Sequence, residues 1–159
     1  MLITVKRRSG SKETVTIKIP PGVKDGGRVR VPGKGDEGWE GGPNGDLFIY
    51  INVKPHGYFK REGEDIYLDC PITIKEALLG GTVKVPTIDG FVSIKMPPGV
   101  QSGQRVRIKG KGVYLPDGGR GSQYVTVHIV LPKKVDQRSK ELIEEFGKIN
   151  PYDPREDLW

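Results

Sequence analysis

An internal repeat limits the folds open to this chain more than any other property of its sequence. Residues 15–35 read VTIKIPPGVKDGGRVRVPGKG, and residues 92–112 read VSIKMPPGVQSGQRVRIKGKG. Fourteen of these 21 aligned positions are identical, which chance does not give. A second match follows each copy after a variable loop, in residues 44–54 and 120–130. A period of about 77 residues is too long for a solenoid and indicates two tandem β units.

Each copy of the repeat reads as a strand, a turn, a second strand, a loop and a third strand. Val15, Ile17 and Ile19 alternate with polar residues, as in a half-buried strand. Pro20 and Pro21 end that strand because proline has no N–H for the ladder. The predicted fold class is therefore all-β.

The two copies differ in what precedes them. Before the second copy, residues 66–72 alternate as a strand, and Thr73 and Glu76 form a capping box for a short helix that ends at Gly80. Only residues 1–13 precede the first copy. The sequence therefore predicts a fragment cut inside its first domain, with a sheet edge left open.

The C-terminal residues change from strand to helix patterning. Residues 135–149 are predicted to form an amphipathic helix with Asp136 as its N-cap. Its apolar stripe comprises Leu142, Ile143, Phe146 and Ile149. A single helix of this length is marginal alone, so its stripe needs a partner, either the chain's own sheet or a second copy.

Composition and motif spacing exclude several classes of protein. No apolar run of about 18 residues could span a membrane, and no secretory signal is present, so we expect a cytoplasmic protein. Cys70 is the single cysteine, and it is predicted to pack in the core. Neither His56 nor His128 has metal-ligand spacing. We therefore predict no cofactor, no metal and no enzymatic activity.

A basic run near the N-terminus is a candidate contact for an acidic partner or for nucleic acid. It comprises Lys6, Arg7, Arg8 and Lys12, and the alternative is a solvated hairpin tip. Arginines on the predicted strands at positions 28, 30, 105 and 107 would extend a nucleic-acid surface. Aromatic residues do not interleave with these charges along the chain, which argues against single-strand binding.

Four segments, residues 56–65, 76–81, 85–90 and 94–112, resemble the C-terminal substrate-binding region of DnaJ-type (forty-kilodalton heat-shock) J-domain co-chaperones. The repeat and the final helix match too, so the resemblance covers essentially the whole chain. It implies two tandem, similar β-sandwich domains of short strands with small helical insertions, followed by a dimerisation helix. The expected boundaries are residues 1–56, 57–133 and 134–159.

Several family features are missing from this sequence. It has no His-Pro-Asp triplet, no Gly/Phe-rich linker and no repeated Cys-x-x-Cys. We therefore expect no stimulation of a partner ATPase and place the chain in the branch without zinc fingers. That branch includes curved-DNA-binding proteins, which the tail at residues 152–159 resembles, so DNA binding is the alternative function.

The resemblance also implies a function and its residues. Family members are dimers that hold unfolded polypeptides and deliver them to a seventy-kilodalton ATP-driven chaperone, whose acidic C-terminal tail is a candidate ligand of the basic run. A client strand adds beside residues 2–6, over an apolar groove that maps to Ile3, Val5, Val15 and Ile49. The dimerisation candidates are Leu142, Ile143, Phe146, Leu158 and Trp159.

Overall fold

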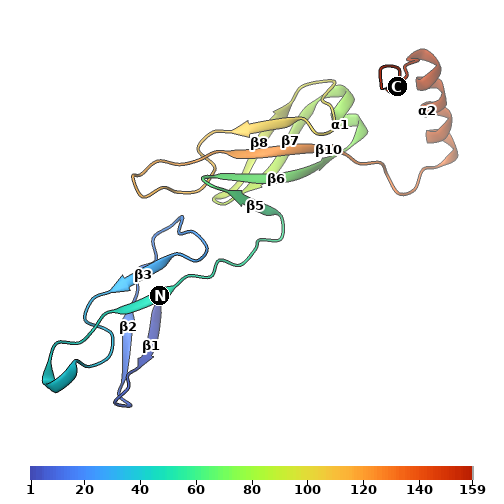
Figure 1. Cartoon of the computed structure of the whole chain (residues 1–159). Helices are drawn as coiled ribbons and strands as arrows, with labels where there is room; N and C mark the ends of the chain where they lie inside the picture. The colour runs from blue at the N-terminus through green and yellow to red at the C-terminus, as the bar shows by residue number, and fades with distance from the viewer. Residues whose placement is uncertain (159) are drawn as a thin grey trace.

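The computed structural model describes residues 1–158, and its elements follow the repeat (Figure 1). Thirteen elements occur in this order: β1 Leu2–Lys6, β2 Lys12–Thr16, β3 Arg28–Val31, the 3-10 turn η1 Trp39–Gly41, β4 Leu47–Tyr50, β5 Phe59–Glu62, β6 Asp65–Ile72, α1 Ile74–Leu79, β7 Gly81–Thr87, β8 Gly90–Met96, β9 Arg105–Ile108, β10 Gln123–Ile129 and α2 Gln137–Ile149. The structure is all-β with a C-terminal helix, as predicted.

Residues 58–130, here called the second unit, form a two-layer β-sandwich. One layer is a four-stranded sheet in the order β5-β6-β10-β9, in which β6 and β10 run parallel and the other pairs are antiparallel. The other layer is the β7–β8 hairpin. The buried core between them comprises Leu68, Cys70, Ile72, Ala77, Val85, Ile94, Met96, Val100, Val125 and Val127.

Residues 1–53, here called the first unit, contain only part of that architecture. The β1–β2 hairpin corresponds to β7–β8, and the β3–β4 pair corresponds to β9–β10. Each forms a two-stranded sheet, and residues 1–158 contain no counterpart of β5, β6 and α1 in the first unit. Only Val15 and Ile17 are fully buried apolar residues there. The first unit therefore has a much smaller core than the second.

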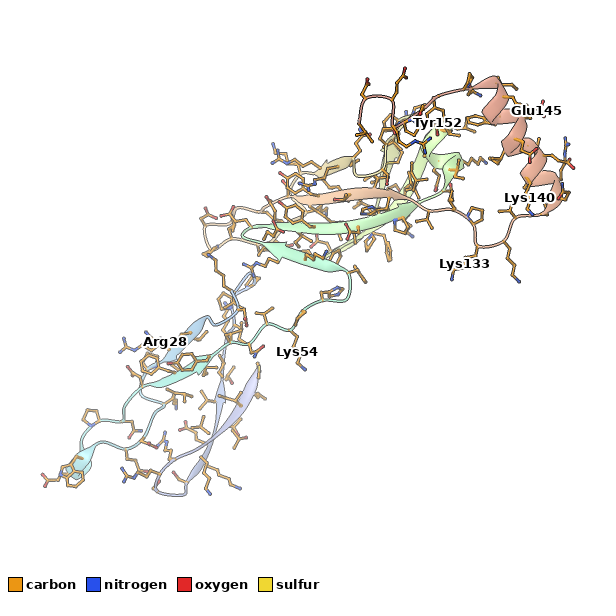
Figure 2. All side chains as sticks on the ribbon, turned by 45° about the vertical axis from the view of Figure 1, so that its right-hand side comes forward. Arg28, Lys54, Lys133, Lys140, Glu145 and Tyr152 are labelled. Atoms are coloured by element: carbon orange, nitrogen blue, oxygen red, sulfur yellow. The ribbon has the colours of Figure 1, made fainter. Side chains whose placement is uncertain are left out.

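Both helices begin where the sequence predicts. The Thr73 hydroxyl accepts a hydrogen bond from the Glu76 N–H, and the Glu76 carboxylate accepts one from the Thr73 N–H, which completes the capping box. Asp136 caps α2 by accepting from the Ser139 N–H at 2.8 Å. Helix α2 stands apart from the sandwich, beyond an extended segment that includes Lys133 (Figures 1 and 2).

A small polar junction joins the two units. The Arg61 guanidinium on β5 donates to the carbonyl oxygens of Gly22 and Val23, both at 2.8 Å. A Cβ on Gly22 would lie 2.0 Å from the Tyr114 carbonyl oxygen, so only glycine fits there. No helix within residues 1–158 has the length and apolar character needed to cross a bilayer.

Candidate functional site

The four predicted groove residues lie on the two sheets of the first unit. Ile3 and Val15 are cross-strand partners in the β1–β2 hairpin, and Val5 is two residues along the same face. Ile49 lies on the separate β3–β4 sheet, where its partner is Val29. Val15 is buried, whereas the other three are only half-buried. The register thus brings three of the four together on one hairpin.

Comparison with the second unit shows why these side chains are partly exposed. Ile3 corresponds to Val85 and Ile49 corresponds to Val125, and the exposed fractions of the two valines are 1% and 0%. In the second unit, side chains from β6 and α1 complete the core over these positions. The first unit has no such cover among residues 1–158, and Ile3 and Ile49 are therefore partly exposed in the described chain.

Each strand of the first unit has one free hydrogen-bonding edge within the described chain, because its two sheets have two strands each. β1 pairs with β2 alone, and β4 pairs with β3 alone. A free edge offers unpaired backbone N–H and C=O groups to an extended peptide. An apolar face beside a free edge is the combination that strand addition requires.

The predicted basic run lies around the tip of the β1–β2 hairpin. Lys6 and Lys12 are direct cross-strand partners and are exposed. Like charges placed opposite one another repel, so an anion bound between them would relieve the repulsion. Residues 1–158 provide neither lysine with a carboxylate within ion-pair distance.

Arg7, by contrast, is engaged within the chain. Its guanidinium pairs with Glu13, which also binds Lys34. The Lys34 hydrogen bond, followed by the charges of Lys34 and Arg7, holds the pKa of Glu13 below its usual value. Arg8 has an exposed side chain, and its N–H donates to Asp36 at 3.0 Å. The cluster therefore offers Lys6, Arg8 and Lys12 to a ligand, and Arg7 has a structural role.

Three of the four strand arginines have aromatic neighbours, which corrects the sequence-based interpretation, whereas Arg30 forms an ion pair with Asp46. The arginine-to-ring-centroid distances are 4.8 Å for Arg28 over Phe48, 5.5 Å for Arg105 over Tyr67 and 6.0 Å for Arg107 over Tyr124. Tyr67 and Tyr124 stack at 5.3 Å. Arg28 projects from β3 into solvent (Figure 2). The aromatics come from neighbouring strands, so the sequence of one strand does not show the pairing.

The apolar stripe of α2 is exposed. Leu142, Ile143 and Phe146 are 48%, 57% and 40% exposed, so the helix does not bury its stripe on its own sheet. A cleft of about 970 Å³ separates α2 from the end of the sandwich, and Ile74, Leu131 and Ile143 line it. Leu158 is exposed in the tail, and Trp159 lies outside the described residues.

The single cysteine and the two histidines are the remaining candidates for catalysis or metal binding, and each lies in surroundings typical of a structural residue. Burial raises the pKa of the Cys70 thiol, which disfavours the reactive thiolate. His128 Nε2 lies 3.2 Å from Asp69 Oδ1 on the surface of the sheet. His56 Nδ1 lies 3.4 Å from the N–H nitrogens of Tyr58 and Phe59. Within residues 1–158, no three His, Cys, Asp or Glu residues form a group that could hold a metal.

Sequence reasoning missed the junction at Arg61. Its partners Gly22 and Val23 lie 39 and 38 residues away, in the turn after β2. The cavity beside the junction has a volume of about 680 Å³, and Val53, Phe59, Ile66 and Ile88 contribute to its lining. The Pro-Pro-Gly motif is not a signal for the junction, because it recurs in both copies and a Cβ on Gly99, the counterpart of Gly22, would meet no atom within 4 Å.

Comparison with known proteins places this geometry in a family. The model of the DnaJ C terminal domain matches residues 2–132. A chaperone protein DnaJ of Geobacillus thermodenitrificans is 46% identical over 139 residues, which cover 87% of this chain and 36% of the relative. A curved DNA-binding protein of Coxiella burnetii is 45% identical over 142 residues, covering 89% of this chain and 45% of the relative. The chain thus spans less than half the length of these relatives.

Proposed function

Because the chain belongs to the DnaJ C-terminal domain family, we propose that it binds segments of non-native polypeptides as a dimeric co-chaperone region. It would hold these clients for a seventy-kilodalton ATP-driven chaperone in the cytoplasm, without catalysing a reaction itself. The observation that carries this proposal is the accessible apolar face of the first unit beside the free edge of β1. The proposed domains are residues 1–56 and 57–133, with the helix and tail at 134–159.

In this proposal, a client strand adds to β1 and places alternate apolar side chains over Ile3, Val5, Val15 and Ile49. Main-chain hydrogen bonds supply affinity that does not depend on sequence, and the apolar face selects hydrophobic segments. Such selection suits clients that share only exposed hydrophobic residues.

Client binding is tested with Ile3→Asp and Ile49→Asp, together and singly. Placing a carboxylate on the apolar face should weaken binding of a labelled unfolded polypeptide at least about tenfold, or ~1.4 kcal/mol. Thr4→Asp is the matched control, because Thr4 lies on the opposite face of β1. Undiminished client binding by the folded double variant would remove these residues from the site.

We also propose that the α2 stripe forms the dimer contact. A twofold interface is self-complementary, and the exposed stripe and the apolar cleft beside it supply the surfaces. Sedimentation equilibrium should give about 35 kDa, twice the 17.6 kDa of one chain. A chain that ends at Lys134 should sediment as a monomer, and a monomer in both cases would contradict the proposal.

The basic cluster is proposed as the site for the acidic tail of the seventy-kilodalton chaperone. Carboxylates would bind between Lys6 and Lys12, with Arg8 adjacent. Lys6→Glu with Lys12→Glu should abolish binding of an acidic tail peptide and leave client binding unchanged. Equal loss of both activities would show that the two sites are not separate.

DNA binding is the second candidate, and the arginine–aromatic pairs favour it. A ring that lies beside a guanidinium group suits a base and its phosphate. Binding of a labelled DNA should fall steeply with salt as each neutralised phosphate releases counterions. Affinity that hardly changes between low and moderate salt would count against this function.

A further inference from the structure

The cavity at the junction is lined by side chains from both units. Its volume is about 680 Å³. Small-molecule sites commonly have volumes of about 300–1,000 Å³ and lie preferentially at domain interfaces. The size and the place of this cavity therefore suit a small ligand.

The walls of the cavity are mainly apolar. Ile66 and Val113 in its lining are buried, with 4% and 7% of their surface exposed. Val53, between β4 and β5, and Ile88, at the end of β7, are each 43% exposed. Two aliphatic side chains from different segments thus lie exposed beside the same cavity. An apolar ligand that filled the cavity would remove both from water, which is favourable.

The two copies of the repeat differ where they line this cavity. Val113 stands where the first copy has Asp36, and Lys24 stands where the second copy has Gln101. The repeated β architecture does not require an apolar residue or a cation at these positions, because the other copy folds without them. These two differences instead give the junction an apolar wall and a positive charge.

Cations outnumber carboxylates around the cavity. Within residues 1–158, the charged residues of its lining are Lys24, Asp25, Lys54, Lys60 and Arg61. The Asp25 carboxylate accepts a hydrogen bond from the Val53 N–H at 2.8 Å. The Arg61 guanidinium donates to backbone carbonyl oxygens, and Lys60 lies 3.7 Å from Asp69. Three of the five charged groups therefore have partners in the chain.

Lys24 and Lys54 are the other two charged groups, and both are exposed. Lys24 lies in the turn after β2, and Lys54 lies on the segment that connects the two units (Figure 2). Residues 1–158 place no carboxylate within ion-pair distance of either ammonium group. An anionic group in the cavity would meet both charges, and a hydrogen bond between two ionised groups is stronger than one between neutral groups.

We propose that this cavity binds a small amphiphilic anion, an alkyl carboxylate. Its alkyl chain packs against Val53, Ile88 and Val113, and its carboxylate lies near Lys24 and Lys54. The apolar walls and the two lysines are complementary to the two parts of such a molecule. This site is separate from the client face, the dimer contact and the strand arginines, and it does not depend on the functions proposed for them.

The bound ligand should also link the two units. Lys24 belongs to the first unit, and Ile66, Ile88 and Val113 belong to the second, so the complete site exists only while the units are in contact. A ligand that binds only that state stabilises it by mass action. Opening of the junction should therefore become rarer as the ligand concentration rises.

Amide hydrogen exchange of the intact chain, followed by mass spectrometry, tests the proposal. The probe is sodium dodecanoate below its micelle concentration. At about ten times its Kd, exchange in residues 22–26 and 53–61 should slow about tenfold, because the ligand reduces the open population by that factor. Dodecyltrimethylammonium has an alkyl chain of the same length and the opposite charge, and it should give no protection there.

Two variants test the apolar wall and the charge separately. Ile88→Asp and Lys54→Glu should each weaken dodecanoate binding at least about fivefold. Phe91→Asp and Lys95→Glu are the matched controls, because they make the same changes at exposed positions of β8, and they should bind dodecanoate as the unaltered chain does. Lys54 is exposed, so Lys54→Glu tests the site even if Ile88→Asp disturbs the β7–β8 turn.

Three results would each overturn the proposal. The first is equal protection by dodecanoate and dodecyltrimethylammonium, which would mean that the lysines do not select an anion. The second is protection confined to residues 1–7 or 137–149, which would place the alkyl chain on the other exposed apolar surfaces. The third is unchanged dodecanoate affinity in both Ile88→Asp and Lys54→Glu.

Discussion

In each unit, one acidic residue anchors the lysine of the Gly-Lys-Gly turn. Glu13 binds Lys34 in the first unit, and Asp89 binds Lys111 at 3.0 Å in the second. Lys34 and Lys111 are equivalent residues of the repeat. Asp89 also receives the Arg120 guanidinium at 2.7 Å. The lysines of these glycine-rich turns therefore have structural partners in the hairpins beside them.

The Asp89 cluster should make stability depend on pH. Hydrogen bonds from Arg120, then from Lys111, lower the pKa of Asp89 from 3.8 to about 2. Since the folded state holds the proton less tightly, the cluster stabilises the fold above pH 4 and loses that effect as pH falls to about 2. Asp89→Asn should lower the denaturation midpoint at pH 7, and the difference from the unaltered chain should shrink towards pH 2.

Asp157→Asn in the exposed tail is the control for this titration. It should leave the midpoint unchanged at every pH. A constant effect of Asp89→Asn from pH 7 to pH 2 would show that the side chain acts through packing and not through its charge.

At the scale of elements, equivalent hairpins have different surroundings. Met96 on β8 is 1% exposed beneath β6 and α1, whereas its counterpart Ile19 is 36% exposed. The energetic value of an apolar side chain depends on the cavity that its removal leaves. The same position of the repeat is therefore core in one unit and surface in the other.

Alanine substitution at these two positions should separate the two environments. Met96→Ala should lower the free energy of unfolding by about 2–5 kcal/mol, because a buried side chain leaves a cavity. Ile19→Ala should cost less than about 1 kcal/mol, because water fills the space. Urea unfolding followed by hydrogen exchange of each unit measures both, and equal costs would contradict the incomplete core of the first unit.

Local sequence signals predicted most of the elements. Alternation identified the strands but not all of their ends, because β2 ends at Thr16 and the predicted strand ran on through Ile19 to Pro20. Thr73 with Glu76 placed the start of α1, and Asp136 placed the start of α2. Each of these features depends on residues that are close together in the chain, so the sequence of that segment is enough to predict it. The buried state of Cys70 followed from the same alternation.

Pairing between strands was harder to predict. Alternation identifies the inward face of a strand but not the sheet to which the strand belongs. The family resemblance grouped Ile49 with Ile3, and alternation alone does not show that they lie on different sheets. The rings near Arg105 and Arg107 and the carbonyl partners of Arg61 are likewise distant in sequence. The groove and dimer residues stay predictions until binding and mass are measured.

At the scale of the whole molecule, the two units should differ in stability. The second unit has a continuous core between two layers, whereas the first has two separate hairpins with little buried apolar area. Local stability follows buried contacts, so the units need not unfold together. In increasing urea, amides of residues 1–53 should lose protection before those of residues 65–130.

Hydrogen exchange measured at a series of urea concentrations checks this order. The strands β6 and β10 serve as the internal reference, because they form the centre of the larger sheet. A single transition shared by both units would show that the junction at Arg61 couples them fully. In that case contacts with the second unit would stabilise the small core of the first unit.

The junction also has a mechanical consequence. In the proposed function, a client bound to the first unit, with a second chain bound by the helix at the other end, would transmit tension through the contacts around Gly22. Two hydrogen bonds from Arg61 and the close contact between Gly22 and the Tyr114 carbonyl bear that load. Hydrogen bonds break over short extensions. The junction between the two units is therefore stiff under small forces and becomes compliant once the Arg61 hydrogen bonds break. In the proposed function, the junction would therefore set the force at which a bound client can move relative to the second unit.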